Sequence, residues 1–84
     1  RLPMDDERLK KQLKSPVADL VNCGSRWGGA ITAALFLEAF VPPGMAWAHL
    51  DIAGVDTVKE PFGWSPKGAT GFGVRCLVSW LETL

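Results

Sequence analysis

The feature that most restricts the fold is a largely apolar segment with the alternation of a β-strand, AWAHLDIAG at residues 46–54. Side chains alternate across a β-strand, so Trp47, His49 and Asp51 would lie on one face and mostly aliphatic residues on the other. Neither face is plainly polar. Strands of this kind are covered on both sides, as in the sheet of an α/β protein. The segment therefore predicts a buried strand.

Helices are predicted before and after this strand. Residues 4–16 read as a short surface helix that Asp5 can cap. Residues 29–44 form a second helix that is apolar nearly all round, and such helices are buried on most sides. The final helix follows Thr70, which we expect to cap it. Its apolar residues recur at i, i+3, i+4 and i+7, namely Val74, Leu77, Val78 and Leu81.

The order helix, helix, strand, helix predicts an α/β fold, with residues 55–69 as a long loop that wraps a surface or rims a site. Ligands of open α/β sheets bind beyond the carboxyl ends of the strands. Here that end is residues 53–56, where small residues would let another group come close. The rim of any small-molecule site is expected there.

Composition narrows the class of protein. Nine basic residues balance nine acidic ones, whereas proteins that bind nucleic acid or membrane surfaces usually carry a basic excess. No apolar run is long enough to span a membrane, and no signal peptide follows Arg1. Apolar residues make up 48% of the chain, and the nine glycines come in addition to these. The share of apolar residues and glycine together is high for so short a chain. We therefore expect partners to cover its surface and the chain to be part of a longer polypeptide.

The sequence offers few groups for metal binding or catalysis. Cys23 and Cys76 lie far apart and His49 is the single histidine, so no clustered ligand set is present and no metal site is predicted. We interpret the cysteines as buried and reduced in a cytosolic protein. His49 and Asp51 could act as a base and its orienting carboxylate, but no serine lies in a nucleophile-elbow pattern. A hydrogen-bonded structural histidine is the better interpretation.

Two glycine-rich turns each precede a helix, GSRWGG at residues 24–29 and KGATGFG at residues 67–73. Helix N-termini attract anions, which leaves a phosphate contact open at either turn. Neither turn matches the P-loop or the dinucleotide fingerprint, and neither follows a convincing strand. Close packing of the backbone is the favoured explanation for both.

Three segments in this order resemble the C-terminal part of the leucyl aminopeptidase family, also called the cytosol aminopeptidase family. They are ADLVNCGSRWGGAITAALFLEAF (18–40), WAHLDIAG (47–54) and KGATGFGVRCLVSWL (67–81), and the likeness covers essentially residues 1–84. The resemblance implies that these residues are the C-terminal portion of an α/β/α sandwich of the zinc-exopeptidase type, incomplete on its own.

The same resemblance implies a cytoplasmic, hexameric enzyme that removes N-terminal residues from peptides with two divalent metal ions, zinc or manganese. Its metal ligands, a lysine and several carboxylates, and its catalytic residues lie in segments absent from this sequence, among them the NTDAEGR motif. The chain alone is therefore predicted to be inactive and to need the remainder of the polypeptide. Its contribution would be a wall of the substrate pocket, with Ala53 and Asp56 at matching positions.

One departure from the family falls in that wall. Family members commonly place a bulky apolar residue where this chain has Asp56, so the residue could favour polar or basic substrate side chains or could turn to solvent. Two other functions stay open. The chain could be a non-enzymatic interaction or assembly element of a larger oligomer, or an anion-binding module that uses the glycine-rich turn at residues 67–73.

Overall fold

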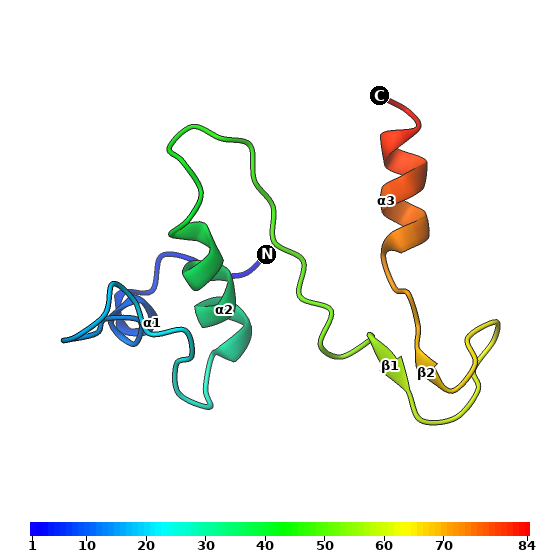
Figure 1. The fold of residues 1–84 in the computed structure, drawn as a ribbon, viewed down its shortest axis with the longest axis horizontal. Helices are drawn as coiled ribbons and strands as arrows, with labels where there is room; N and C mark the ends of the chain where they lie inside the picture. Colours follow the sequence, from blue (N-terminus) through cyan, green and yellow to red (C-terminus); the bar gives the residue numbers. More distant parts are fainter. The chain divides into compact units, whose positions relative to one another are not determined.

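The computed structural model describes all residues from 1 to 84, and they form two compact units, Arg1–His49 and Leu50–Leu84. The regular elements are α1 (Glu7–Lys11), α2 (Gly29–Glu38), β1 (Thr57–Val58), β2 (Gly68–Ala69) and α3 (Val74–Leu81). Figure 1 shows them along the chain. Two helices precede two short strands and one helix follows them, so the chain is of mixed helix and strand content, and the two units are described separately below.

The first unit begins with α1, whose start is fixed by Asp6 rather than by Asp5. The Asp6 carboxylate accepts from Arg8 three times, from its amide at 2.9 Å, from Nε at 3.1 Å and from Nη2 at 2.7 Å. These bonds favour the ionised carboxylate, foremost the one from the Arg8 side chain, and they lower the pKa of Asp6 to about 2. The helix is shorter than the predicted residues 4–16.

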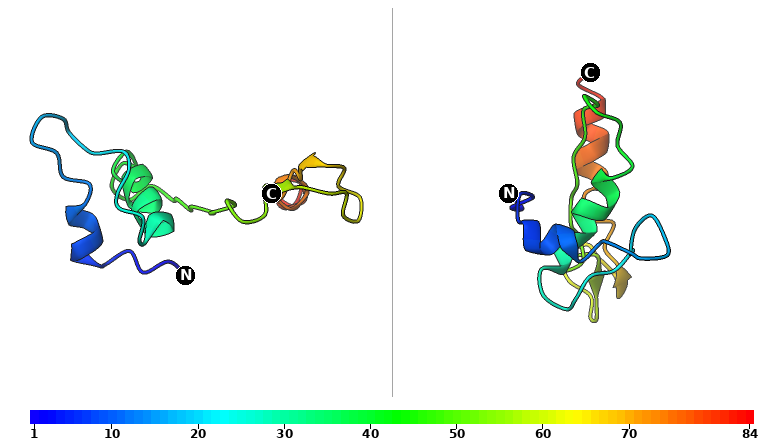
Figure 2. Two further views of the ribbon diagram at one scale, coloured as in Figure 1. Left: turned by 90° about the horizontal axis from the view of Figure 1, so that it is seen from below. Right: turned by 90° about the vertical axis from the view of Figure 1, so that its left-hand side faces the viewer.

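α1 packs on α2, and the two helices lie side by side in Figures 1 and 2. The core between them is small. Its buried members are Leu13, Thr32, Ala34 and Leu35. The remaining faces of α2 are more open than an all-round apolar helix predicts, because this chain covers it on one side only. α2 also ends at Glu38 rather than at residue 44, ahead of two prolines that disfavour helical backbone before them.

The glycine-rich turn before α2 allows the close packing that the sequence predicts. A Cβ on Gly24 would lie 2.6 Å from Oε1 of Gln12, whose oxygen accepts from the amide of Ser25 at 2.7 Å. A Cβ on Gly28 would lie 2.9 Å from Cδ2 of Leu9. Gly28 also has a φ of +72°, which favours glycine. The prediction is confirmed for both residues.

The second unit contains a β-hairpin where the sequence predicts only a loop. β1 and β2 are antiparallel, with Thr57 opposite Ala69 and Val58 opposite Gly68. At the tip, Phe62 and Ser65 exchange both backbone hydrogen bonds, at 3.0 and 2.9 Å. Gly63, the first central residue of this turn, has a φ of +57°. Trp64, the second, does not have a positive φ, because only glycines do in this chain. This is the pattern of a type II′ turn.

α3 follows the hairpin and confirms the predicted apolar periodicity. Its N-cap is Gly73, with a φ of +86° and no side-chain cap, so the prediction that Thr70 caps the helix is wrong. The four apolar residues of the stripe remain open to solvent in this chain; they are Val74, Leu77, Val78 and Leu81. Ser79 lies on the opposite side of the helix.

The predicted strand at residues 46–54 is not formed. Residues 46–52 lie in no helix or strand, and no backbone hydrogen bond involves residues 46–51. Figure 1 draws the segment as irregular chain. The physical reason is that a strand exists only as a member of a ladder, and no segment of this chain pairs with it. The β-structure lies in β1 and β2 instead.

Much apolar surface is exposed. Eighteen large hydrophobic residues are exposed, among them Trp27, Trp64 and Leu84. Both cysteines are free, but Cys23 and Cys76 are exposed, so the expectation that they are buried is wrong. No helix has the length and apolar character that crossing a membrane would need.

Candidate functional site

The residues at the predicted site form a turn that begins at Asp51. The Asp51 carboxylate accepts from the amide of Ala53 at 2.9 Å, an Asx turn. The amide of Val55 then donates to the carbonyl of Ile52 at 3.0 Å. These two local bonds bend the chain over residues 51–55, directly before β1. The stretch Ala53–Asp56 is called the wall turn below.

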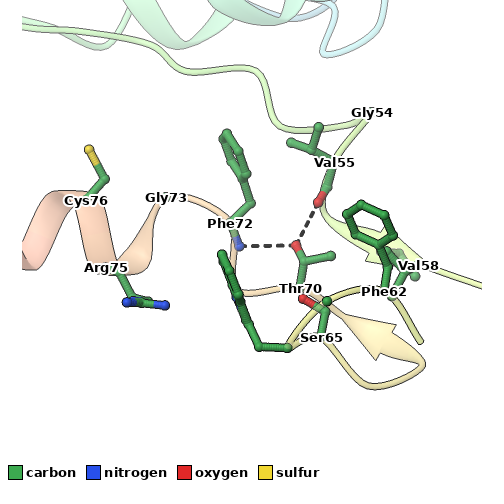
Figure 3. Close-up of a pocket in the computed structure, with 14 residues that line it drawn as sticks. Gly54, Val55, Val58, Phe62, Ser65, Thr70, Phe72, Gly73, Arg75 and Cys76 are labelled. Atoms are coloured by element: carbon green, nitrogen blue, oxygen red, sulfur yellow. Dashed lines mark hydrogen bonds between the residues drawn. The ribbon is translucent and has the colours of Figure 1, made fainter. Parts of the chain in front are cut away.

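Thr70 ties the wall turn to the segment after β2. Its amide donates to the carbonyl of Asp56 at 2.8 Å, which extends the β1–β2 ladder by one pair. Its hydroxyl lies 2.6 Å from the carbonyl oxygen of Val55 and accepts from the amide of Phe72 at 3.1 Å. Figure 3 shows both bonds of the hydroxyl. Two loops that are far apart in the sequence are thereby joined through one side chain.

A hollow of about 640 Å³ lies beside the wall turn, within the Leu50–Leu84 unit. Aromatic residues and glycines make up much of its lining, and Figure 3 draws Phe62 of the hairpin and Phe72 of the segment before α3 among the lining residues. Gly54, Val55 and Thr70 also contribute to its lining. The hollow can therefore accept an apolar group, and the wall turn forms part of its edge.

One charged side chain lies at this hollow. Arg75, in the first turn of α3, places its guanidinium carbon 5.4 Å from the ring centroid of Trp64, a cation–π contact. Trp64 is itself 84% exposed and follows Gly63 in the type II′ turn. The contact joins the hairpin tip to the start of α3, and Arg75 keeps its positive charge near the hollow.

The two predicted substrate-binding residues lie at the edge of the hollow and do not line it. Ala53 and Asp56 belong to the wall turn, and their neighbours Gly54, Val55 and Thr57 are the lining residues. The Asp56 side chain is exposed and makes no hydrogen bond or ion pair, so its carboxylate is free within this chain. The position of the predicted site is thus described, while the binding role of Ala53 and Asp56 stays a prediction.

His49 and Asp51 have separate contacts, each with residues close to it in the sequence. The Asp51 carboxylate binds the amide of Ala53 and so shapes the wall turn. His49 Nε2 is buried without a hydrogen-bond partner, while its ring stacks on Trp47 at 6.3 Å between centroids. The expectation of a hydrogen-bonded histidine is therefore wrong for Nε2.

Thr70 is the residue that sequence reasoning misplaced. The sequence predicts it as the cap of α3, because the side-chain oxygen of a threonine before a helix often accepts a hydrogen bond from an amide of the first turn. In the structure Gly71, Phe72 and Gly73 intervene, and the hydroxyl bonds to Phe72 in a short threonine turn instead. The available signal is the threonine followed by glycine, which is typical of such turns.

The glycines around Thr70 serve backbone conformation rather than close packing. Gly68, Gly71 and Gly73 all have positive φ, at 118°, 65° and 86°, and no atom lies within 4 Å of a Cβ built on any of them. Close packing is therefore the wrong explanation for this turn. Histidine, cysteine and carboxylate side chains form no group of three or more that could hold a metal ion.

Comparison with known proteins gives a consistent result. Residues 1–78 match the family described as the cytosol aminopeptidase family, catalytic domain. A protein of Aquifex aeolicus (strain VF5) called "Probable cytosol aminopeptidase" is 59% identical over 80 residues, which is 95% of this chain. Proteins with the same name from Prochlorococcus marinus (strain MIT 9211) and Synechococcus sp. (strain CC9311) are 53% and 54% identical over 94% and 96% of the chain.

These matches cover a small part of each relative. The chain spans about 16% of the length of the curated relatives named above. The likeness therefore concerns the segment that contains the wall turn and the two units described here.

Proposed function

Because the chain belongs to the cytosol aminopeptidase family, we propose that the complete polypeptide is a metal-dependent aminopeptidase that hydrolyses N-terminal residues from peptides. Residues 1–84 would form the C-terminal part of its catalytic domain. The observation that carries this proposal is the family match over residues 1–78, with three separated motifs in the family's order. The resemblance drawn from those motifs is confirmed. A purely non-enzymatic role is not favoured, since the relatives are named as aminopeptidases.

We propose that this segment supplies scaffold and pocket wall rather than reactive groups. The residues of this chain do not fit a metal centre, because no three candidate ligands come together. The two divalent ions of the proposed enzyme, zinc or manganese, would be held by ligands outside residues 1–84. No chemical step is assigned to a side chain of this segment.

We propose further that residues 46–54 are a strand of an α/β/α sandwich of the zinc-exopeptidase type in the complete domain. Supporting this, the backbone groups of residues 46–51 are unpaired and neither face of the segment is plainly polar. The open stripe of α3 would then pack on the same sheet. A cytoplasmic homo-hexamer would cover part of the other exposed apolar surface, and peptides would be the substrate.

Ala53 and Asp56 are the proposed substrate-binding residues. The wall turn is fixed by four backbone carbonyl and amide contacts, so it offers a defined surface to a substrate side chain. Asp56 adds a carboxylate that has no partner in this chain. A cationic substrate side chain would pair with it, so we propose that N-terminal lysine or arginine is accepted alongside apolar residues.

The first experiment tests the activity itself. The full-length polypeptide that contains these residues is assayed on leucyl and lysyl anilides with Mn²⁺ or Zn²⁺, beside a chelator-treated sample and the isolated 84-residue chain. We expect turnover by the metal-loaded full-length protein alone. Turnover by the isolated chain above the metal-free blank would contradict the assignment of the reactive groups to other segments. Absence of any peptidase activity in the full-length protein would refute the proposed function.

The second experiment tests the role of Asp56. Asp56→Asn keeps the size of the side chain and removes its charge. We expect kcat/KM for the lysyl substrate to fall about two- to fivefold relative to the leucyl substrate, the range of a solvent-exposed ion pair. Glu60→Gln, which neutralises an exposed carboxylate elsewhere in the β1–β2 hairpin, is the matched control. Equal lysyl-to-leucyl ratios in wild type and Asp56→Asn would contradict the role of Asp56 in selectivity.

A further inference from the structure

The wall turn is held to another segment by a single side chain, that of Thr70. Within the Leu50–Leu84 unit, the other side-chain bond at this turn is the local one from Asp51 to Ala53. Asp51 acts two residues along the chain, so it sets the shape of the turn but not its position. Thr70 acts across 15 positions, on Val55. Beside the backbone bond from the amide of Thr70 to the carbonyl of Asp56, the placement of the turn against the hollow therefore depends on the Thr70 hydroxyl.

The hydroxyl of Thr70 acts both as a donor and as an acceptor of hydrogen bonds. It carries one proton, and the carbonyl oxygen of Val55 at 2.6 Å is closer than that of Asp56 at 3.1 Å. The carbonyl of Asp56 already accepts from the amide of Thr70 at 2.8 Å. The proton is thus donated to Val55, and a lone pair accepts from the amide of Phe72.

Removal of this hydroxyl would leave two backbone groups without their partners, the carbonyl of Val55 and the amide of Phe72. Each contributes to the hollow, Val55 from the wall turn and Phe72 from the segment before α3. The ladder bond between Thr70 and Asp56 would remain, because it uses the backbone. The hairpin would therefore persist while the wall turn gained freedom to move away from the hollow.

We propose that Thr70 is a positioning residue for substrate binding, which acts by holding the wall turn, with Ala53 and Asp56, against the pocket for the substrate's N-terminal side chain. This inference rests on the proposed function and deepens it. A pocket that is competent in only part of the population binds its ligand more weakly by that fraction. Loss of the hydroxyl is thus expected to raise KM and to leave the chemical step unchanged.

The test uses the full-length, metal-loaded protein with Thr70→Val, Thr70→Ala and Thr70→Ser. Valine keeps the shape of threonine without the hydroxyl, alanine removes it without an added branch, and serine retains it. KM and kcat are measured on leucyl and glycyl anilides. Thr83→Val is the matched control, since the Thr83 hydroxyl donates to the carbonyl of Trp80 at 2.6 Å, at the end of α3.

For the leucyl substrate we expect KM to rise up to about thirtyfold in Thr70→Val and Thr70→Ala, as for loss of two ordinary hydrogen bonds, with kcat unchanged. Thr70→Ser should restore the wild-type KM. Glycine has no side chain to place in the pocket, so its KM should not change. Thr83→Val should match wild type for both substrates.

Several results would overturn the proposal. Equal KM values for Thr70→Val and Thr83→Val would do so, as would the same rise for glycyl and leucyl substrates or a fall in kcat alone. Failure of both hydroxyl-free variants to fold, beside a normal Thr70→Ser, would assign the hydroxyl to stability instead. All of these comparisons are made with an active wild-type protein. An inactive wild type would instead refute the proposed function, on which this inference rests.

Discussion

The exposed apolar stripe of α3 makes a strong prediction about the complete protein. If a sheet covers this stripe there, Leu77→Asp places a charge in a buried interface. In the isolated 84-residue chain the same residue is 46% exposed, so an aspartate would keep its carboxylate in water. One substitution should therefore be severe in the full-length polypeptide and mild in the isolated chain.

The magnitude follows from the exposure of Leu77. Full burial of a leucine side chain contributes about 1.5–3 kcal/mol, so covering the remaining 46% contributes about 0.7–1.4 kcal/mol. Aspartate loses this contribution and also brings an ionised carboxylate into the interface, which costs several kcal/mol more. The free energy of folding and assembly of the full-length protein should thus weaken by about 4 kcal/mol or more, a range in which single substitutions are exceptional.

The assay compares Leu77→Asp with Ser79→Asp, which introduces the same residue in the same helix on the opposite face. Thermal unfolding and size exclusion are measured for the full-length protein. We expect Leu77→Asp to lower Tm strongly or to abolish assembly, and Ser79→Asp to behave as wild type. Circular dichroism of the two isolated 84-residue variants should be alike. A full-length Leu77→Asp protein as stable as Ser79→Asp would refute the reasoning that α3 is covered.

Two further predictions concern the Arg1–His49 unit. Gly28→Ala should destabilise it by about 1–2 kcal/mol in thermal melts, because an L residue is strained at the left-handed φ of this position. Gly29→Ala, which has open space around it, should not destabilise the unit. Equal melting curves for the two variants would contradict this. The pKa of Asp6 is lowered from 3.8 to about 2, so its contribution to α1 is complete above pH 3.8 and is lost as the pH falls through about 2. The amide proton shift of Arg8 should titrate near pH 2 by NMR and be flat in Asp6→Asn, and a midpoint at 3.8 would contradict the bond.

Features set by local sequence were predictable. The four-residue apolar stripe correctly predicts α3, because helical periodicity depends on the helix's own residues. Gly24 and Gly28 were interpreted as sites of close packing, since glycine before a helix allows such an approach. The family resemblance came from motif order, which needs no knowledge of contacts. The bounds of α1 and α2 were less accurate, because caps and tertiary packing decide where a helix ends.

Features that join distant residues were not predictable in this way. The hydroxyl of Thr70 meets the carbonyl of Val55 because β1 pairs with β2, and nothing in residues 67–73 alone reveals that pairing. The hairpin itself was hidden in a segment rich in glycine and proline, whose two-residue strands are too short to show alternation. The wall turn was located by the position of small residues, but the residue that holds it was assigned to the helix instead.

Dependence on distant residues also explains why residues 46–54 form no strand in this chain. Its composition describes a strand with neighbours, and the structure shows what remains without them: backbone groups with no partner and a buried Nε2 on His49 with none. Buried polar groups in native proteins are nearly always hydrogen-bonded. Under the proposed function, neighbouring strands would satisfy the backbone, and a group facing His49 would satisfy the ring. A covered segment would also anchor Asp51, from which the wall turn starts.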